Sequence, residues 1–542
     1  MNTTENGNRF HALDRRGFLR TCGKAVLLLS VPSLDIAPSA SAEQSRARRP
    51  VIAEDRFGRL FPSLPPFAEP SQQLREALLE IGNPDGLMDA GDALDQGPVE
   101  LIVNPELSKN NPNNPNHTAG VTFFGQFIDH DMTFDLTSRL GRPVDPERSP
   151  NLRTPGFDLD SVYGAGPIAD RELYQPSGRG RFQPGIKFKV ENGGRFEDLP
   201  RSKDGAAVIA DPRNDENLII AGLHAAFLLF HNRLVDALLE SRATFVAMGA
   251  RPGNAPDVFH EARRLMTWHY QWIIVHEFLP LIVGQQLVNE ILARGRRFYR
   301  PEVPFIPVEF QGAAYRFGHS MVRPSYRANL AGDADNQPFF GMVFDPSQEN
   351  SNDPDDMRGG FRASRRFIGW QTFFDFGDKE VRPNKRIDTK ISTPLFDLPI
   401  AAIPGAETSP TSLPQRNLLR HVTWQLPSGQ SIANVMKAPV LAREDLGELS
   451  AFGLKLDEST PLWYYVLKEA EIMEDGLRLG PVGGRIVAEV IIGLLQLDRD
   501  SYLSADPRWR PTLPARNGKV TRDFRMVDFL TFAGVDPKTR GQ

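Results

Sequence analysis

The chain contains one cysteine among 542 residues, Cys22, so an intrachain disulfide is excluded. Cys22 lies in a segment that we expect to be cleaved off, and a mature protein without cysteine has no thiol catalysis. The chain also lacks an excess of charge of one sign, because its 63 Lys and Arg residues nearly balance its 68 Asp and Glu residues. Without a basic stripe, nucleic acid is not expected as a partner.

Other signatures are missing as well. No segment after the N-terminal region has 18 uninterrupted apolar residues, so no membrane span is expected. The zinc motif His-Glu-x-x-His is absent, since His276-Glu277 lacks the second histidine. Neither a Gly-x-Ser-x-Gly elbow nor a Gly-x-Gly-x-x-Gly loop after a strand is found. Zinc protease, serine hydrolase and dinucleotide chemistry are therefore not expected.

The N-terminus carries export features in the expected order. Arg15-Arg16 stands in DRRGFLR, an apolar run covers residues 25–31, and Ala40-Ser41-Ala42 is a small-residue cleavage site. A disordered basic tail is the alternative. We predict a twin-arginine signal peptide over residues 1–42, an arm or linker over 43–97 and the main domain over 98–542. The protein is then exported by the twin-arginine machinery to the periplasm or the extracellular space.

Helical periodicity dominates the rest of the chain. Apolar residues at helical spacing predict helices over residues 73–81, 218–241, 257–283, 315–322, 462–473 and 482–497. Residues 104–117, 139–166 and 331–366 are rich in Pro, Gly, Asn or Asp and are predicted as loops. Strand signals are few and short, such as residues 181–190. We expect a mainly α protein, one large helical domain with long loops.

The stretch VTFFGQFIDHD, residues 121–131, is the most informative. As a helix it places Gln126, Asp129 and His130 on one edge, opposite an apolar stripe, with Asp131 further round. Burying carboxylates costs several kcal/mol each unless a partner is present, and an ion or cofactor would be such a partner. A solvent-facing group that caps or forms ion pairs is the alternative.

The loop TPGFDLD, residues 154–160, offers oxygen atoms at alternate positions. Calcium takes six to eight oxygen ligands, some of them backbone carbonyls. Thr154, Asp158 and Asp160, a carbonyl of Gly156, and Asp131 from the helix form a candidate set. The spacing does not fit an EF-hand, and a loop of Asx turns is the alternative.

Two further stretches hold candidate residues. DPRNDEN, residues 211–217, starts a long helix, and Arg213 and Glu216, three residues apart, can share one face of it. Helix capping with an ion pair inside the helix is the alternative. YRFGHSMV, residues 315–322, holds His319 beside Gly318, which would let a flat ring approach. Imidazole is the commonest proximal haem ligand, but a hydrogen-bonded core histidine is the alternative.

Taken in this order, these four stretches resemble the animal-type haem peroxidase superfamily. The resemblance runs from about residue 98 to residue 505 and includes FHNRL (230–234), VHEFLP (275–280) and LGPVGG (479–484). The twin-arginine signal favours a bacterial branch.

The resemblance implies a role for each candidate residue. His130 is the distal histidine, Gln126 its neighbour in the distal pocket and Arg213 the distal arginine. His319 is the proximal iron ligand. Asn417, in LPQRNL (413–418), hydrogen-bonds the proximal imidazole, which fixes its tautomer.

The remaining residues implied by the resemblance hold cofactors. Arg316 is a haem-site residue, and Asp129 and Glu216 match the carboxylates that form ester bonds to haem b. The calcium ligands are Asp131, Thr154, Gly156, Asp158 and Asp160.

The implied activity is reduction of hydrogen peroxide with oxidation of a halide, pseudohalide or small organic donor, as in a response to oxidative stress. His130 takes a proton from peroxide and returns it to the leaving oxygen, while Arg213 stabilises the charge as the O–O bond breaks. Asn217 stands where some members have a haem-linked methionine, so that bond is excluded and chloride oxidation is less expected.

Two other functions are weighed against the peroxidase. A fatty-acid dioxygenase of the cyclooxygenase-like branch has a radical tyrosine three residues before the proximal histidine. Arg316 stands there, and Tyr315 is one residue away. If the chain were a secreted adhesion protein that only binds haem, His130 or Arg213 would be expected to be lost, and both are present.

Overall fold

The computed structural model describes residues 56–176, 184–192, 196–240, 258–332, 336–361, 365–403 and 408–541. The predicted signal peptide and residues 43–55 lie outside this range. Arg56–Gln542 forms one compact unit. Residues 56–97, which we expected in an arm or linker, are part of this unit, and Phe57, Phe61, Leu74 and Leu78 are buried in its core.

The mainly helical fold predicted from the sequence is confirmed. The predicted helices are α2 (Gln72–Ile81), α4 (Ala119–Met132), α6 (Leu218–Glu240), α8 (Val258–Ile273), α14 (Leu462–Glu474) and α15 (Pro481–Leu497). The other helices are α3 (Gly97–Val103), α5 (Asp160–Tyr163), α9 (Leu279–Val283), α10 (Gln285–Arg294), α11 (Val308–Gln311), α12 (Leu413–Thr423), α13 (Gly429–Met436), α16 (Tyr502–Ala505), α17 (Met526–Ala533) and α18 (Pro537–Arg540).

Strands are short and occur in pairs throughout the described ranges. β1 (Phe57–Gly58) runs parallel to β7 (Ile306–Pro307). The antiparallel pairs are β2 (Asn113–Thr118) with β10 (Pro383–Lys385), β3 (Tyr174–Pro176) with β4 (Pro184–Phe188), β5 (Glu191–Asn192) with β6 (Glu197–Asp198), and β8 (Ser325–Asn329) with β9 (Phe339–Met342). Each pair ties two loops together rather than forming a layer of the fold.

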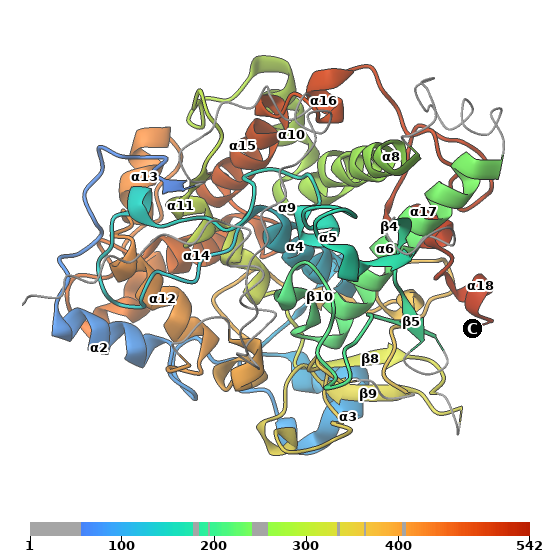
Figure 1. The fold of residues 1–542 in the computed structure, drawn as a ribbon. Helices are drawn as coiled ribbons and strands as arrows, with labels where there is room; N and C mark the ends of the chain where they lie inside the picture. Colours follow the sequence, from blue (N-terminus) through green and yellow to red (C-terminus); the bar gives the residue numbers. More distant parts are fainter. Residues whose placement is uncertain are drawn as a thin grey trace, which may run out of the picture. The chain divides into compact units, whose positions relative to one another are not determined.

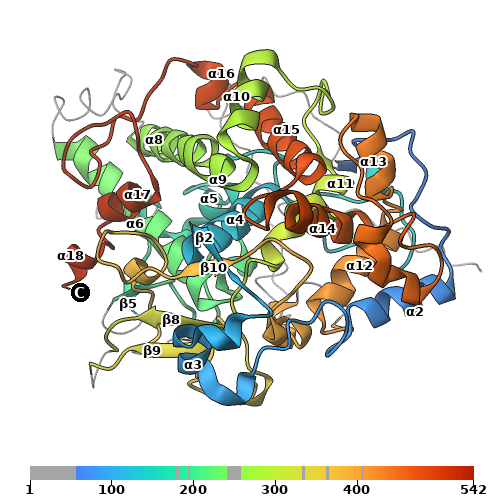
Figure 2. The same ribbon diagram turned by 180° about the vertical axis from the view of Figure 1, so that it is seen from behind.

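Helix α4 occupies the interior of the unit. Figures 1 and 2 show it at the centre, with α6 and α8 on one side and α12 and α14 on the other. It contacts α6 and β10 directly. The rings of Phe127 and Phe227 stack with centroids 4.3 Å apart, which joins α4 to α6. The polar residues of α4 are therefore held inside the protein.

Helix α6 is long and apolar enough to cross a membrane by length and composition, and 83% of its most apolar window is buried inside the protein. It packs against α8 and α17. Phe230 stacks on Phe529 with the ring centroids 4.0 Å apart. These contacts are those of a core helix.

Parts of the secondary structure differ from the prediction. Residues 113–118 form β2 instead of a loop, and part of the predicted loop over 331–366 forms β9. The predicted helix over 315–322 is a 3₁₀ turn, Ala314–His319, that stops before Pro324. The helix predicted over 257–283 is interrupted by a π-helical turn, Ile274–Phe278, between α8 and α9. Tertiary pairing and proline override local periodicity at these places.

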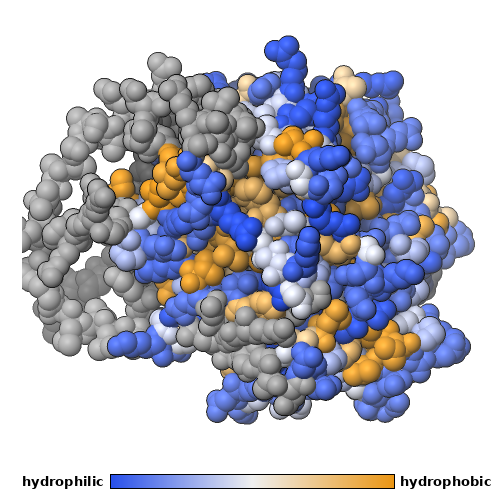
Figure 3. Space-filling view, turned by 90° about the vertical axis from the view of Figure 1, so that its right-hand side faces the viewer, coloured by the Kyte–Doolittle hydropathy of each residue, from blue (hydrophilic) through white to orange (hydrophobic). Residues whose placement is uncertain are grey.

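The described part of the surface exposes several large apolar side chains. On the face seen in Figure 3, hydrophobic residues form separate patches between hydrophilic ones. The exposed large apolar side chains, such as Val99, Ile168 and Val520, come from different elements. Single exposed apolar residues of this kind are ordinary for a folded protein.

Candidate functional site

Helix α4 is fixed at its N-terminus by the loop before β10. The backbone N–H of Ala119 donates to Arg382 O and that of Gly120 to Phe373 O, both at 2.8 Å. Val121, Phe124 and Ile128 are buried, as the apolar stripe predicts, and His130 and Asp131 are buried too. The solvent-facing alternative for His130 and Asp131 is therefore wrong.

His130 meets residues from the start of α6. Its Nδ1 lies 2.9 Å from Oδ1 of Asn214, and its backbone oxygen accepts a hydrogen bond of 2.9 Å from Nη2 of Arg213. Its Nε2 lies 3.9 Å from Oε1 of Glu216. Burial and the charge of Arg213 lower the pKa of His130 to about 3, so the imidazole is neutral.

Arg213 is held by a buried carboxylate that the sequence analysis assigned no role in the site. Asp211 caps the 3₁₀ turn Pro212–Asp215 and accepts from Arg213 Nη2 at 2.7 Å and Nε at 3.1 Å. Arg153 Nε donates to the same carboxylate at 2.8 Å. Burial alone would raise the pKa of Asp211, but Arg153 and Arg213 outweigh it and hold the pKa well below its usual range. Two arginines thus share one ionised aspartate.

Gln126, Glu216 and Asn217 form a chain of polar contacts beside His130. Gln126 Nε2 donates to Glu216 Oε1, and Asn217 Nδ2 donates to Gln126 Oε1 at 3.3 Å. Burial raises the pKa of Glu216 to about 8, against the opposing charge of Arg213. Burial also raises the pKa of Asp129, whose Oδ1 accepts from Thr133 Oγ1 at 3.2 Å. Both carboxyl groups are therefore disposed towards the neutral form.

The 3₁₀ turn Ala314–His319 brings His319 to α12. Nδ2 of Asn417 lies 2.7 Å from Nδ1 of His319, and Oδ1 of Asn417 accepts from Arg316 Nη1 at 3.2 Å. A histidine that binds iron through Nε2 carries its proton on Nδ1 and needs an acceptor there. A half-turn of the Asn417 amide would present Oδ1 to His319, because amide oxygen and nitrogen have nearly the same shape.

The residues at His319 fit a flat, anionic cofactor. A Cβ built on Gly318 would meet no atom within 4 Å, so there is open space beside the histidine. Arg316 forms no ion pair within the part of the chain that the structure describes. Burial and the charge of Arg420 lower the pKa of Arg316 to about 9, which an added carboxylate would reverse. Haem b, with a planar ring and two propionates, matches these requirements.

A second cluster gathers the predicted calcium ligands. Carboxylate oxygens of Asp131, Asp158 and Asp160 lie within 4.8 Å of one another. Burial and the charge of Asp158 raise the pKa of Asp131 to about 7. Thr154 Oγ1 donates to Asp160 Oδ2 at 3.2 Å, and the N–H of Gly156 donates to Thr154 O at 2.7 Å. The structure therefore brings together three of the predicted ligands, with Thr154 bonded to one of them, while Gly156 contacts Thr154.

The two clusters are connected by one side chain. Arg153 Nη1 lies 3.5 Å from Asp160 Oδ1, while its Nε donates to Asp211, the partner of Arg213. Asp131 follows His130 directly in α4. A change in the carboxylate cluster therefore has a short path to both His130 and Arg213.

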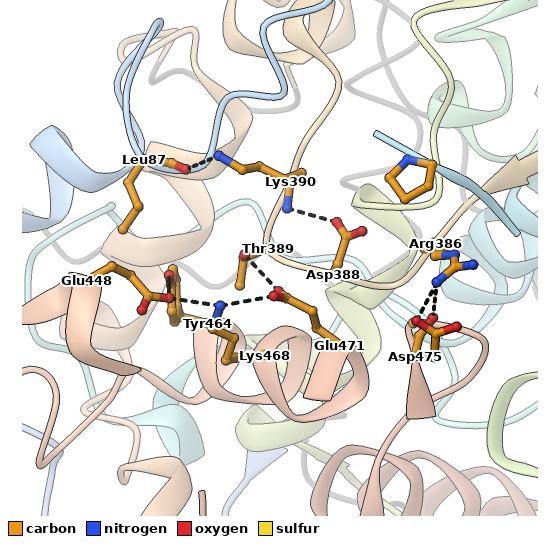
Figure 4. A pocket seen from close by; sticks show the side chains of 12 residues that line it. Leu87, Arg386, Asp388, Thr389, Lys390, Glu448, Tyr464, Lys468, Glu471 and Asp475 are labelled. Carbon is orange, nitrogen blue, oxygen red and sulfur yellow. Dashed lines mark hydrogen bonds and ion pairs between the residues drawn. The ribbon is translucent and has the colours of Figure 1, made fainter. Parts of the chain in front are cut away.

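A surface pocket of about 400 Å³ is separate from these clusters and shares no lining residue with them. Figure 4 shows its charged walls, where Lys468 bridges Glu448 and Glu471 and Arg386 pairs with Asp475. Lys390 and Asp388, which also line it, bond to the backbone instead: Lys390 Nζ donates to Leu87 O at 2.9 Å, and Asp388 Oδ1 accepts from the N–H of Lys390 at 2.9 Å.

Comparison with known proteins finds similarity to haem peroxidases. The family model described as animal haem peroxidase matches residues 135–364. That range contains Arg213, Glu216 and His319, while His130 and Asn417 lie outside it. The chain is 27% identical over 191 residues to a peroxidasin homolog (pxn-2) of Caenorhabditis elegans, covering 32% of the chain and 13% of that protein. It is 25% identical over 202 residues to human thyroid peroxidase, covering 34% of the chain and 21% of that protein.

Solved structures share the fold. Peroxidase A from Dictyostelium discoideum superposes with a TM-score of 0.55 at 16% identity, over 84% of this chain and 89% of that one. A fatty acid alpha-dioxygenase from Arabidopsis thaliana superposes with a TM-score of 0.50 at 14% identity, over 82% of this chain and 72% of that one. At these identities the likeness concerns the fold alone.

The fold is thus that of helical haem peroxidases and dioxygenases. Residues 135–364 thus resemble the animal haem peroxidase family, and peroxidases are among the relatives that the chain matches. Its matches span only 13% and 25% of the peroxidasin homolog and of the chorion peroxidase of Aedes aegypti.

Proposed function

We propose that the chain is a haem-dependent peroxidase that reduces hydrogen peroxide and oxidises a halide, a pseudohalide or a small organic donor. The observation that carries the proposal is the contact between His130 and Arg213, from α4 and the turn before α6, next to the carboxyl groups of Asp129 and Glu216. His319, with Asn417 and Arg316, offers an iron ligand and an anion partner.

The residues divide the work of the reaction. Bound haem would supply the iron that takes up peroxide and stores its oxidising equivalents. The neutral imidazole of His130 accepts a proton from hydrogen peroxide at Nε2 and later gives it to the departing oxygen. Arg213, fixed by Asp211, stabilises negative charge as the O–O bond breaks. Gln126 lies beside this pair through its contact with Glu216.

The family's dioxygenase chemistry is less well supported. Arg316 stands three residues before His319, where the radical tyrosine of the cyclooxygenase-like branch would be. The neighbouring Tyr315 uses its hydroxyl to donate to Gly125 O at 3.1 Å, and its ring stacks on Phe310. That tyrosine serves to join α4 to the His319 turn.

Calcium is part of the proposal. Three carboxylates in the interior, with a raised pKa at Asp131, call for a bound cation, and oxygen ligands suit calcium. Asp129 and Glu216 are proposed to bond to haem as esters. Asn217 donates to Gln126 and accepts from the N–H of Ile220, so its side chain has a structural role. Because an asparagine cannot form the haem–methionine bond, bromide, thiocyanate or an organic donor is favoured over chloride.

Export by the twin-arginine route is proposed from Arg15-Arg16, the apolar run and Ala40-Ser41-Ala42. These residues lie outside the described ranges. Replacement of both arginines by lysine is expected to abolish export of active protein. Export of the active variant at the normal level would contradict this assignment.

The experiment that tests the proposed function is a haem titration of the purified chain, followed by addition of peroxide and bromide, thiocyanate or a phenol. We expect a Soret band at one haem per chain and donor oxidation that needs peroxide. His319→Ala is expected to lose the native Soret band, while His276→Ala, a change of an exposed histidine, retains it. Haem binding without donor oxidation would favour the non-catalytic alternative.

A further inference from the structure

Asn214 lies between two buried histidines. Its Oδ1 faces Nδ1 of His130 and its Nδ2 faces Nδ1 of His224, at 2.9 Å each. His130 comes from α4, Asn214 from the turn before α6, and His224 from the second turn of α6 itself. Asn214 and His224 are fully buried. One amide therefore joins the proposed catalytic histidine to a second histidine that does not reach it directly.

The second histidine is unlike the other buried histidines of the described chain. His231 is bonded at both ring nitrogens, to Tyr163 Oη and to Ile186 O, each at 2.9 Å. His421 likewise meets Asn417 O at 3.1 Å and the N–H of Trp463 at 2.9 Å. Nε2 of His224 has no hydrogen-bond partner among the residues that the structure describes. Within those residues, the polar contact of the His224 ring is the one with Asn214.

With the amide of Asn214 oriented so that Oδ1 faces His130, the contacts decide where the protons lie. An amide oxygen only accepts and an amide nitrogen only donates, so His130 carries its proton on Nδ1 and His224 presents a lone pair at Nδ1. Nε2 of His130 is then unprotonated. The reversed amide would reverse both histidines and place a proton on Nε2 of His130, where it would block acceptance of a proton from peroxide.

We propose that Asn214 and His224 are positioning residues that keep Nε2 of His130 free to act as the base. His224 holds the amide nitrogen of Asn214, and Asn214 in turn holds the proton of His130 on Nδ1. A partner that orients a working imidazole is a familiar way to set its tautomer. This inference rests on the proposed peroxidase function for its consequence, but the tautomer itself exists with or without turnover.

The histidine tautomers are measured by ¹⁵N NMR on protein labelled at its ten histidines and loaded with diamagnetic zinc protoporphyrin. The signals of His130 and His224 are assigned from His130→Gln and His224→Leu. We expect His130 to be protonated at Nδ1 and His224 at Nε2. A proton on Nε2 of His130 overturns the inference.

The second measurement is the rate of reaction of the haem-loaded enzyme with hydrogen peroxide. Asn214→Leu and His224→Leu are expected to slow it by about 10- to 100-fold, the range found when a partner that orients a functional imidazole is lost. In the same variants the His130 signal should show a mixture of tautomers. An unchanged rate and an unchanged tautomer in both variants overturn the inference.

The control is His231→Leu, which removes a buried histidine from the same helix, one without contact to Asn214. It is expected to lower the unfolding temperature while the tautomer of His130 and the peroxide rate stay unchanged. If the wild type binds haem but does not react with peroxide, the proposed function fails, and the NMR result still decides the tautomer. If the wild type reacts with peroxide but His130 carries its proton on Nε2, this inference is wrong and the proposed function stands.

Discussion

Nη2 of Arg213 donates a hydrogen bond to the backbone oxygen of His130, with 2.9 Å between the two atoms. The guanidinium also lies over the ring of Phe134, 4.1 Å from its centroid. The backbone of the proposed base in α4 and the guanidinium from the turn before α6 are therefore tied to each other. Neither residue can shift without disturbing the other. The proposed reaction needs both residues at the same oxygen–oxygen bond, so their relative position matters.

Asp211 is the residue whose loss should disturb this group most. Asp211→Asn leaves Arg213 buried without its carboxylate partner and Arg153 with Asp160 alone, and breaking a buried ion pair in this way costs about 3–5 kcal/mol. We expect a loss of that size in the free energy of unfolding, measured with urea at neutral pH, together with a slower reaction with peroxide.

Glu474→Gln is the matched control for Asp211→Asn. It breaks the pair of Glu474 with Arg478, in which the arginine is about half exposed. Pairs of this kind contribute about 0–1 kcal/mol. If the two changes lower the free energy of unfolding equally, the buried Asp211 network contributes no more to stability than an exposed ion pair.

Calcium should stabilise the wild type through the carboxylate cluster. A ligand present at 100 times its Kd adds about 2.7 kcal/mol to the free energy of unfolding. We expect calcium to raise the midpoint of thermal unfolding of the wild type and EGTA to lower it, while Asp158→Asn responds to neither.

Asp145→Asn serves as the control for calcium, because Asp145 is partly exposed and caps a 3₁₀ turn outside the cluster. It should keep the full response to the ion. If calcium does not change the unfolding midpoint of the wild type, or if Asp158→Asn responds to calcium like the wild type, the cluster is not a calcium site.

Covalent attachment of haem is expected through Asp129 and Glu216. After reconstitution and brief exposure to peroxide, part of the haem should stay with the polypeptide during extraction with acidic butanone. Asp129→Asn and Glu216→Gln should each reduce that fraction, and the double variant should release all haem. Glu469→Gln, a change of a buried carboxyl that binds the N–H groups of Val482 and Gly483, should behave like the wild type. Retention of haem by the double variant would refute the ester assignments.

Much of the fold could be predicted because its helices bury continuous apolar faces. α4, α6, α14 and α15 follow from spacing alone, since a period of 3.6 places their Leu, Ile, Val and Phe residues on the core side. The strand β2 could not, because NNPNHT has low strand propensity and is held by pairing with β10. The turn at His319 was predicted as a helix, since periodicity over a few residues does not separate α from 3₁₀ geometry.

The candidate site divides in the same way. His130, Arg213, His319 and the carboxylates of the calcium cluster are recognisable from motifs in which several chemical groups stand close in sequence. Asp211 was noted only as part of a helix start, and Asn214 and His224 were not singled out. Asp211 meets Arg153, 58 residues away, and Asn214 meets His130, 84 residues away. The contact of Asn214 with His224 turns on which ring nitrogen faces the amide, and spacing carries neither kind of information.

The most direct test of the account is the absorbance spectrum of the haem-loaded protein, followed by stopped flow after addition of hydrogen peroxide. The wild type should show a Soret band that changes within milliseconds to seconds and returns when a donor is added. His130→Ala should bind haem equally well and react about 100- to 10,000-fold more slowly, the usual contribution of a general acid–base residue. A wild-type Soret band that peroxide leaves unchanged, or a His130→Ala variant that reacts as fast as the wild type, would contradict the account.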